Sequence, residues 1–296
     1  MDLFLNRLFD ALSNGATYAL IALSLVMIFK ATTLINFAQG EFAMFGAFIV
    51  LVLAVEQGLP MWIALLGSMG LSALFAAGFE RSLIRPFDPT NHLPLVIITL
   101  GAFLAINSIA GIIWRFDPRA FPNLFGSGVA VEIGGATLRW YTVGVMATVA
   151  ATAILLTLLL NRTKIGLAFR AVSSNLESSE LVGVRVGPTL QFGWALAAAV
   201  GTLGASVFAA DPFRQLEPTI MVRVLIFAVS AAALGGLDSI GGAIIGGILI
   251  GCVQSLLVPY TPIPNDLSLA AAVVVLMLVL LFKPSGLFGT PRVERV

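Results

Sequence analysis

The sequence predicts an all-α polytopic membrane protein, because of its composition, its hydropathy and the length of its apolar runs. Of its 296 residues, 59% are apolar and 10% are charged, and the mean hydropathy is +1.02. Soluble domains instead carry about 25% charged residues. Apolar runs close to the roughly 20 residues that cross a bilayer recur along the chain. A single transmembrane domain over residues 1–296 is therefore expected, with about 8–9 hydrophobic helical segments.

Nine apolar runs predict these segments. The seventh and eighth are separated only by the glycine-rich sequence LGGLDSIGG. They form either two crossings or a broken, re-entrant pair of half-helices, and both alternatives begin and end on the same side of the membrane. The runs are 11–29, 34–53, 61–79, 94–114, 141–160, 191–210, 220–237, 240–258 and 267–282.

Lysine and arginine predict the orientation, because the cytoplasmic loops of membrane proteins are enriched in these residues. If the loop 161–189 is cytoplasmic, ten lysines and arginines fall on its side of the membrane and five on the opposite side, with Arg223 near a helix start. The N-terminus is then outside and the C-terminus is in the cytoplasm. The loop 115–140 is external, and its alternating final stretch predicts a short β-hairpin.

The loop 161–189 predicts a helix–turn–helix that lies on the cytoplasmic surface. The sequence from Ser174 to Glu177 is typical of a capping box that begins a second short helix, and Gly183 is expected to end it. The first helix has apolar residues at helical spacing on one face. These are Ile165, Phe169, Val172 and Leu176.

Several classes of function are excluded by absent motifs. None of the three lysines follows a glycine, so the chain has no Walker A loop for ATP. One histidine, His92, and one cysteine, Cys252, cannot form a zinc site of the H-E-x-x-H or C-x-x-C type. The net charge of +1 without a basic run gives no indication of nucleic-acid binding. We expect no catalysis and no cofactor on this chain.

Three polar residues interrupt the second apolar run. Asn36, Gln39 and Glu41 lie within six positions around Gly40, which weakens a helix. Polar side chains in a membrane segment are costly and are typical of functional sites. The stretch is either a broken helix that lines a polar cavity or a packing site inside the bundle.

Polar side chains also share one face of the first apolar run. Asn14 and Tyr18 are separated by one helical turn. They are expected either to form hydrogen bonds between helices or to line a translocation pathway.

Glycines dominate the sequence between the seventh and eighth runs. Gly242 and Gly246 form a G-x-x-x-G pair, which permits close contact between membrane helices. Gly235 and Gly236 belong to a predicted turn, in which Asp238 is expected to cap the following helix.

The cytoplasmic helix pair has two interpretations. An amphipathic segment can rest on lipid headgroups. Its polar positions, however, carry both Arg170 and the acidic residues Glu177 and Glu180, and this mixture suits a protein groove better than an anionic membrane. A membrane protein that has no energy source and presents a docking helix suggests a transporter subunit driven by a separate ATPase.

Four stretches of the chain carry a family resemblance. They are NGATYALIALSLVMIFKATTLINFAQGEFAMFGAF (14–48), TKIGLAFRAVSSNLESSELVGV (163–184), LGGLDSIGGAIIGGILIG (234–251) and LLFKPSGLFG (280–289). In their order and spacing, which cover nearly the whole chain, they resemble the permease subunits of branched-chain amino acid ABC importers, in particular the shorter of that family's two permease types.

The resemblance implies a multi-pass subunit of the bacterial inner membrane that imports Leu, Ile, Val or related amino acids. Its partners would be a second permease chain, two ATP-binding subunits that hold ATP and Mg²⁺, and an external substrate-binding protein. Segment 163–184 would be the coupling helix seated in the ATPase, although ESSE at 177–180 replaces a more alanine-rich pattern. The coupling residues would be Arg170, Asn175, Glu177 and Gly183.

Two alternatives to this function remain at the level of the sequence. Urea or short-chain amide permeases share the core pattern N-x-A-x-G-E-F, which occurs here at residues 36–42. An ion-coupled secondary transporter would work without an ATPase, and the docking-like loop argues against it.

Overall fold

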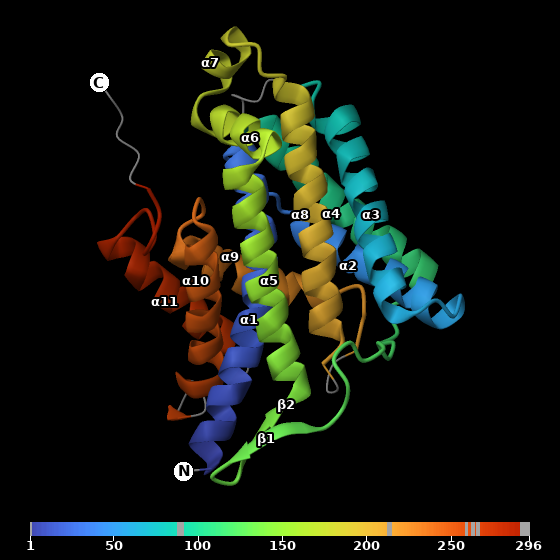
Figure 1. Cartoon of the computed structure of the whole chain (residues 1–296), viewed down its shortest axis with the longest axis vertical. Coiled ribbons are helices and arrows are strands. Elements are labelled where there is room, and N and C mark those ends of the chain that lie inside the picture. Colours follow the sequence, from blue (N-terminus) through green and yellow to red (C-terminus); the bar gives the residue numbers. More distant parts are fainter. Residues whose placement is uncertain are drawn as a thin grey trace.

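Helix α1 (Asp2–Thr32) forms the axis of the bundle in this computed structural model (Figure 1). From Gly15 to Ile28 every residue of this helix is buried. A helix that is covered on all sides belongs to a core, so the other elements are arranged around α1. The structure describes residues 2–87, 92–211, 215–257, 260–261, 264 and 267–290.

Each of the predicted apolar runs forms a helix. Six of those in the described ranges are long and apolar enough to cross a membrane, and three shorter apolar helices accompany them. This confirms the predicted all-α polytopic membrane fold. After α1 come α2 (Gln39–Leu51), α3 (Met61–Phe79), α4 (His92–Trp114), α5 (Trp140–Arg162), α8 (Val186–Ala209), α9 (Ile220–Gly235), α10 (Ile240–Cys252) and α11 (Ser268–Phe282).

Single π-helical turns continue three of these helices. Val52–Glu56 extends α2, Glu80–Ile84 extends α3 and Val253–Leu257 extends α10. Such turns are rare and occur mostly as single bulges in α-helices. With its π-helical turn, α2 reaches a length that can span a membrane.

The two ends of the bundle carry different elements (Figure 1). At one end the strands β1 (Val129–Ile133) and β2 (Ala136–Arg139) form an antiparallel hairpin, as predicted. Gly134 and Gly135 between them both have a positive φ, which is the backbone of a tight hairpin turn. The opposite end carries the short helices α6 (Lys164–Ser174) and α7 (Leu176–Leu181). We call these ends the hairpin side and the α6 side.

The second helix begins later than its apolar run predicts. Residues 34–38 are not helical, and α2 starts only at Gln39. Thr33 has a φ of 57°, which turns the chain away from the axis of α1. The Asn36 side chain then accepts a hydrogen bond from the backbone N–H of Ala38 at 3.0 Å. A local side-chain bond of this kind competes with the helix and explains the late start.

Helices α9 and α10 run along α1 and back. Before α9, Leu216 exchanges two backbone hydrogen bonds with Arg119 of the loop 115–140. The turn between the helices lies beside the end of α1, where Lys30 donates to the carbonyl of Asp238 at 2.7 Å. Helix α10 then returns until Gly251 lies against Ala11. Helices α9 and α10 are therefore antiparallel to each other, and both lie along α1.

Glycines allow α9 and α10 to touch through their backbones. A Cβ added at Gly246 would lie 2.0 Å from the carbonyl oxygen of Ala231, and one at Gly235 would lie 1.9 Å from that of Gly242. No real Cβ makes contacts this short, so the two helices meet where side chains are absent.

A second glycine face of α10 meets α1. A Cβ at Gly247 would lie 2.7 Å from the carbonyl oxygen of Gly15, and one at Gly251 would lie 2.4 Å from that of Ala11. The two G-x-x-x-G pairs of α10 therefore face different neighbours, one pair facing α9 and the other facing α1. Backbone contact of this kind gives membrane helices extensive van der Waals packing.

We expect Gly246→Ala to destabilise the fold by about 1–3 kcal/mol, which is the usual cost of overpacking. The measurement is thermal unfolding in mild detergent. Gly241→Ala on the same helix is the matched control, because a Cβ there meets nothing within 4 Å. Equal melting temperatures for the two variants would contradict the backbone contact.

Candidate functional site

The polar residues at the start of α2 are held inside the bundle. Asn36, Gln39 and Glu41 are all at most 2% exposed. The Asn36 amide donates to Gln39 Oε1 at 3.3 Å, and Gln39 Nε2 donates to the carbonyl of Ala197 at 3.0 Å. Ala197 lies at the middle of α8. The break between α1 and α2 is therefore fixed deep between helices, with the side chains of Asn36 and Gln39 bonded to protein.

Glu41 connects α2 to two other parts of the chain through Asn107 of α4. The Asn107 amide donates to Glu41 Oε2 at 3.1 Å and to the carbonyl of Pro218 at 2.9 Å. The other carboxylate oxygen, Oε1, is buried and has no hydrogen-bond partner among the described residues. Gly40 beside it lies against α9, where an added Cβ would be 3.3 Å from Leu225 Cβ.

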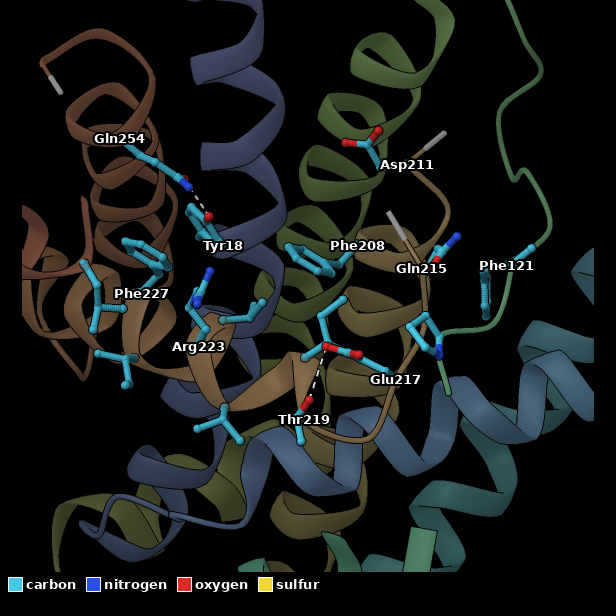
Figure 2. A pocket seen from close by; sticks show the side chains of 17 residues that line it. Tyr18, Phe121, Phe208, Asp211, Gln215, Glu217, Thr219, Arg223, Phe227 and Gln254 are labelled. Atoms are coloured by element: carbon cyan, nitrogen blue, oxygen red, sulfur yellow. Dashed lines mark hydrogen bonds between the residues drawn. The ribbon is translucent and has the colours of Figure 1, made fainter. Parts of the chain in front are cut away.

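A cavity of about 1150 Å³ lies next to this network, between α1, α9 and the loop 115–140 (Figure 2). Asn36, Gln39 and Glu41 do not line it, but Pro218 lies between two of its lining residues. The expected polar cavity is thus beside the helix break and not around it. Residues of the cavity wall include Tyr18, Phe121, Phe208, Asp211, Glu217, Arg223, Phe227 and Gln254.

Asn14 and Tyr18 of the first run both contact the π-helical turn after α10. Asn14 Nδ2 donates to Ser255 Oγ at 3.0 Å, and the Tyr18 hydroxyl donates to Gln254 Oε1 at 2.6 Å. The ring of Tyr18 stacks on Phe227 of α9 with the centroids 5.0 Å apart. Tyr18 therefore forms part of the cavity wall and also joins α1 to α9 and α10.

The cavity contains charges of both signs beside aromatic rings. Arg223 lies in the first turn of α9, and Glu217 accepts a hydrogen bond from Thr219 Oγ1 at 3.2 Å just before it. The exposed Arg223 side chain would be costly against acyl chains, so this face of α9 lies toward water or protein. Sequence reasoning assigned no role to Arg223 or Glu217. The available signal was a lone arginine in an otherwise apolar run.

At the α6 side, asparagine and glycine shape the helix pair. Asn175 caps α7, because its Oδ1 accepts the backbone N–H of Ser178 at 2.8 Å, and Gly183 follows α7 with a φ of 85°. The predicted capping box began one residue earlier. Ser174 instead ends α6, because Asn175 is the residue that adopts the extended backbone of a cap. Glu177 is exposed on α7.

The buried face of α6 differs from the predicted one at its start. Phe169 and Val172 are buried as expected, but Ile165 is exposed and Gly166 is buried in its place. A Cβ at Gly166 would lie 2.3 Å from the carbonyl oxygen of Leu159 in α5. The close approach of α6 to α5 therefore selects glycine and turns Ile165 outward.

The helix pair ends in an apolar tip. Leu181 is 88% exposed and Val182 is 77% exposed. In Figure 1, α7 is at the far end of the bundle, beyond the long helices. Large apolar side chains at a projecting position, beside the exposed acids Glu177 and Glu180, are typical of a surface that contacts another protein.

Hydrogen bonds connect α6 to the turn between α9 and α10. Ser173 of α6 donates to the carbonyl of Lys30 at the end of α1, and Lys30 Nζ donates to the carbonyl of Asp238. The exposed Arg170 lines a second cavity, at the α6 side, together with Lys30 and Asp238. A displacement of α6 would therefore reach α1 and the α9–α10 turn directly.

Asp238 does not have the predicted role of a helix cap. Ser239 caps α10, since its Oγ accepts the backbone N–H of Gly242 at 3.0 Å. The Asp238 carboxylate instead accepts the backbone N–H of Thr290 at 3.1 Å and also the Thr290 hydroxyl. Asp238 thus holds the chain after α11 against the turn.

The sequence FKPSGLFG after α11 completes the end of α9. Leu287 and Phe288 donate their backbone N–H groups to the carbonyls of Leu234 and Gly235 at 2.8 and 2.9 Å. The last carbonyls of a helix have no partner inside that helix, so a neighbouring segment must satisfy them. A Cβ at Gly236 would lie 2.5 Å from the Gly289 nitrogen, which explains why glycine follows α9.

Asn107→Ala should lower the stability of the folded chain by about 1–3 kcal/mol, because both Glu41 and the Pro218 carbonyl then lose a donor. The expected result is a lower melting temperature in mild detergent. Thr99→Val on the same helix is the control, because within the described part of the chain the Thr99 hydroxyl bonds to the carbonyl of Val96 on its own helix and to no other element. A loss no larger than that of Thr99→Val would contradict the role of Asn107.

Comparison with known proteins gives matches over most of the chain. Residues 7–281 match the family model described as branched-chain amino acid transport system / permease component. The permease protein BraD of the high-affinity branched-chain amino acid transport system of Pseudomonas aeruginosa is 30% identical, over 99% of this chain and 98% of its own length. The corresponding permease protein LivH of Escherichia coli is 26% identical over the same shares.

A more distant relative has a different substrate in its name. The fructose import permease protein FruF of Bifidobacterium longum is 25% identical, over 85% of this chain and 70% of its own length. The architecture is therefore shared by permeases whose names refer to amino acids and to a sugar. With the family model covering nearly every helix described above, the chain belongs to the permease component family of branched-chain amino acid transport systems.

Proposed function

We propose that this chain is the permease subunit of an ABC importer that moves branched-chain or other hydrophobic amino acids across the bacterial inner membrane. The family and the relatives BraD and LivH support this function. The excess of lysine and arginine at the α6 side supports an orientation in which that side and the C-terminus are cytoplasmic. The hairpin side then faces outward.

The single observation that carries the proposal is the projecting apolar tip of α6 and α7. Leu181 and Val182 would insert into a groove of an ATP-binding subunit, with Glu177 beside them. Asn175 and Gly183 would hold the tip in shape, since they start and stop α7. Arg170 would lie at the base of the docked pair. ATP and Mg²⁺ bind to the two ATP-binding subunits in this assembly.

When an ATP-binding subunit moves the docked helix α6, α9 would carry that movement to the cavity. Ser173, Lys30 and Asp238 connect α6 with the turn at one end of α9, and Arg223 lies at the opposite end of the same helix in the cavity wall. Closure of the ATP-binding subunits then moves a continuous helix, and the cavity alternates between outward and inward access. Asn36, Gln39 and Glu41 act here as the fixed frame against which α9 moves.

The remaining partners bind at two further surfaces, one beside α9 and one at the hairpin side. A second permease chain, identical or related, closes the open side of the cavity beside α9, because lipid does not tolerate the exposed Arg223 charge there. An external substrate-binding protein delivers the amino acid at the hairpin side. The outward faces of α3 and α4, with exposed residues such as Leu74 and Leu104, contact lipid.

Leu181→Asp should abolish co-purification of the ATP-binding subunits, because a charge replaces the apolar side chain at the centre of the docking surface. ATP-driven uptake should fall with it, while insertion into the membrane stays normal. Leu181→Ile is the matched control and should keep both properties. If Leu181→Asp retains the bound ATPase at wild-type yield, the tip is not the docking surface.

Uptake competition tests the substrate. In vesicles that contain the complete transporter, excess leucine, isoleucine or valine should suppress uptake of labelled leucine, whereas urea and fructose should not. Urea represents the related amide permeases, and fructose represents the substrate in the name of FruF. Suppression by urea or fructose alone would reassign the substrate and leave the permease function in place.

A further inference from the structure

We propose that Arg223 binds the carboxylate of the transported amino acid inside the cavity. The inference rests on the proposed function, which names the class of substrate, and it adds the residue that binds that substrate. It makes the cavity beside α9 a transient binding site for a zwitterion on its way through the membrane.

Arg223 is available for such a contact. It makes no hydrogen bond and no ion pair with any residue in the described ranges. Arg85 shows the contrast, since its guanidinium is bonded to both carboxylate oxygens of Glu80. A guanidinium without a partner among the described residues can bind an external anion, and its planar fork matches a carboxylate.

The surroundings of Arg223 match the rest of an amino acid. The exposed side chains of Val222 and Ile226 provide an apolar surface for an aliphatic side chain, backed by the buried rings of Phe208 and Phe227 (Figure 2). Glu217 lies six residues before Arg223 in the same wall, and its carboxylate can accept a hydrogen bond from an ammonium group. The carboxylate and ammonium of a zwitterion can form ion pairs with Arg223 and Glu217, whereas a neutral sugar can only form hydrogen bonds with them, so the pair favours a zwitterion.

The site would also respond to the α6 side. Arg223 is in the first turn of α9, and the last turn of α9 is bonded to the chain after α11 beside Asp238 and Lys30. Movement of α9 therefore displaces the guanidinium together with the cavity wall. A contact made in the outward-open state can be released in the inward-open state without any change in the substrate.

Uptake of leucine by the complete transporter in proteoliposomes is the first test. Arg223→Gln should reduce uptake at low leucine concentration by about tenfold, the loss expected when a charge-assisted hydrogen bond is removed, while the subunits remain assembled. Arg223→Lys should retain much of the activity. Arg115→Gln, which removes an exposed charge outside the cavity, should behave as wild type.

Thiol labelling is the second test, and it needs no transport. The only cysteine of the chain is removed as Cys252→Ser, and Ile226→Cys places a thiol in the cavity wall. Leucine should slow the reaction of this thiol with a membrane-impermeant reagent several-fold, whereas leucine amide, which lacks the carboxylate, should not. Adding Arg223→Gln should remove the protection by leucine.

The outcomes separate this inference from the proposed function. Normal uptake by Arg223→Gln together with unchanged protection would overturn the inference and leave the importer function intact. Loss of the second permease chain from Arg223→Gln would also overturn it, because the residue would then be an interface contact. Protection by leucine that depends on Arg223, in a complex that takes up no leucine, would support the site and refute the proposed function.

Discussion

Contact between helix backbones is the constraint on which the rest of this structure depends. Inside a membrane, burial of apolar side chains gains little, so helices associate where their backbones can come close. Helix α10 presents glycines to α9 on one face and to α1 on another. This places the α9–α10 turn beside Lys30 and the start of α9 beside the cavity. The polar connections at both ends of α9 are possible only because this packing sets its position.

Side chains with hydrogen-bonding groups then divide into two kinds. Those of the helix break are bonded to protein, as with Asn36 and Gln39, and they give α2 a fixed starting point between α8 and α9. Those of the cavity include Arg223, which forms no hydrogen bond or ion pair with any residue in the described ranges. The first kind fixes the packing of the bundle, and the second leaves a charged group exposed in the cavity wall.

Much of the fold follows from the sequence, because nine apolar runs, two glycine pairs and a hairpin turn depend on local composition. The start of α2 at Gln39 does not, since it results from a hydrogen bond between the Asn36 side chain and the backbone N–H of Ala38. The roles of Ser239 and Asp238 were also beyond reach, because two adjacent polar residues can both cap a helix until the position of Thr290 is known. Arg223 and Glu217 were missed because a cavity wall gathers residues from separate segments, which periodicity within one segment cannot reveal.

The backbone pairing of Arg119 with Leu216 has a mechanical consequence. The two residues exchange both of their hydrogen bonds, and the Arg119 guanidinium also contacts Glu56 at 3.4 Å and the Trp114 carbonyl at 3.3 Å. These bonds attach the loop 115–140 to the segment that holds Glu217 in the cavity wall. A protein that bound to this loop and displaced it would also displace the cavity wall. Displacement of the loop 115–140 at the hairpin side would therefore change the position of Glu217 in the cavity wall.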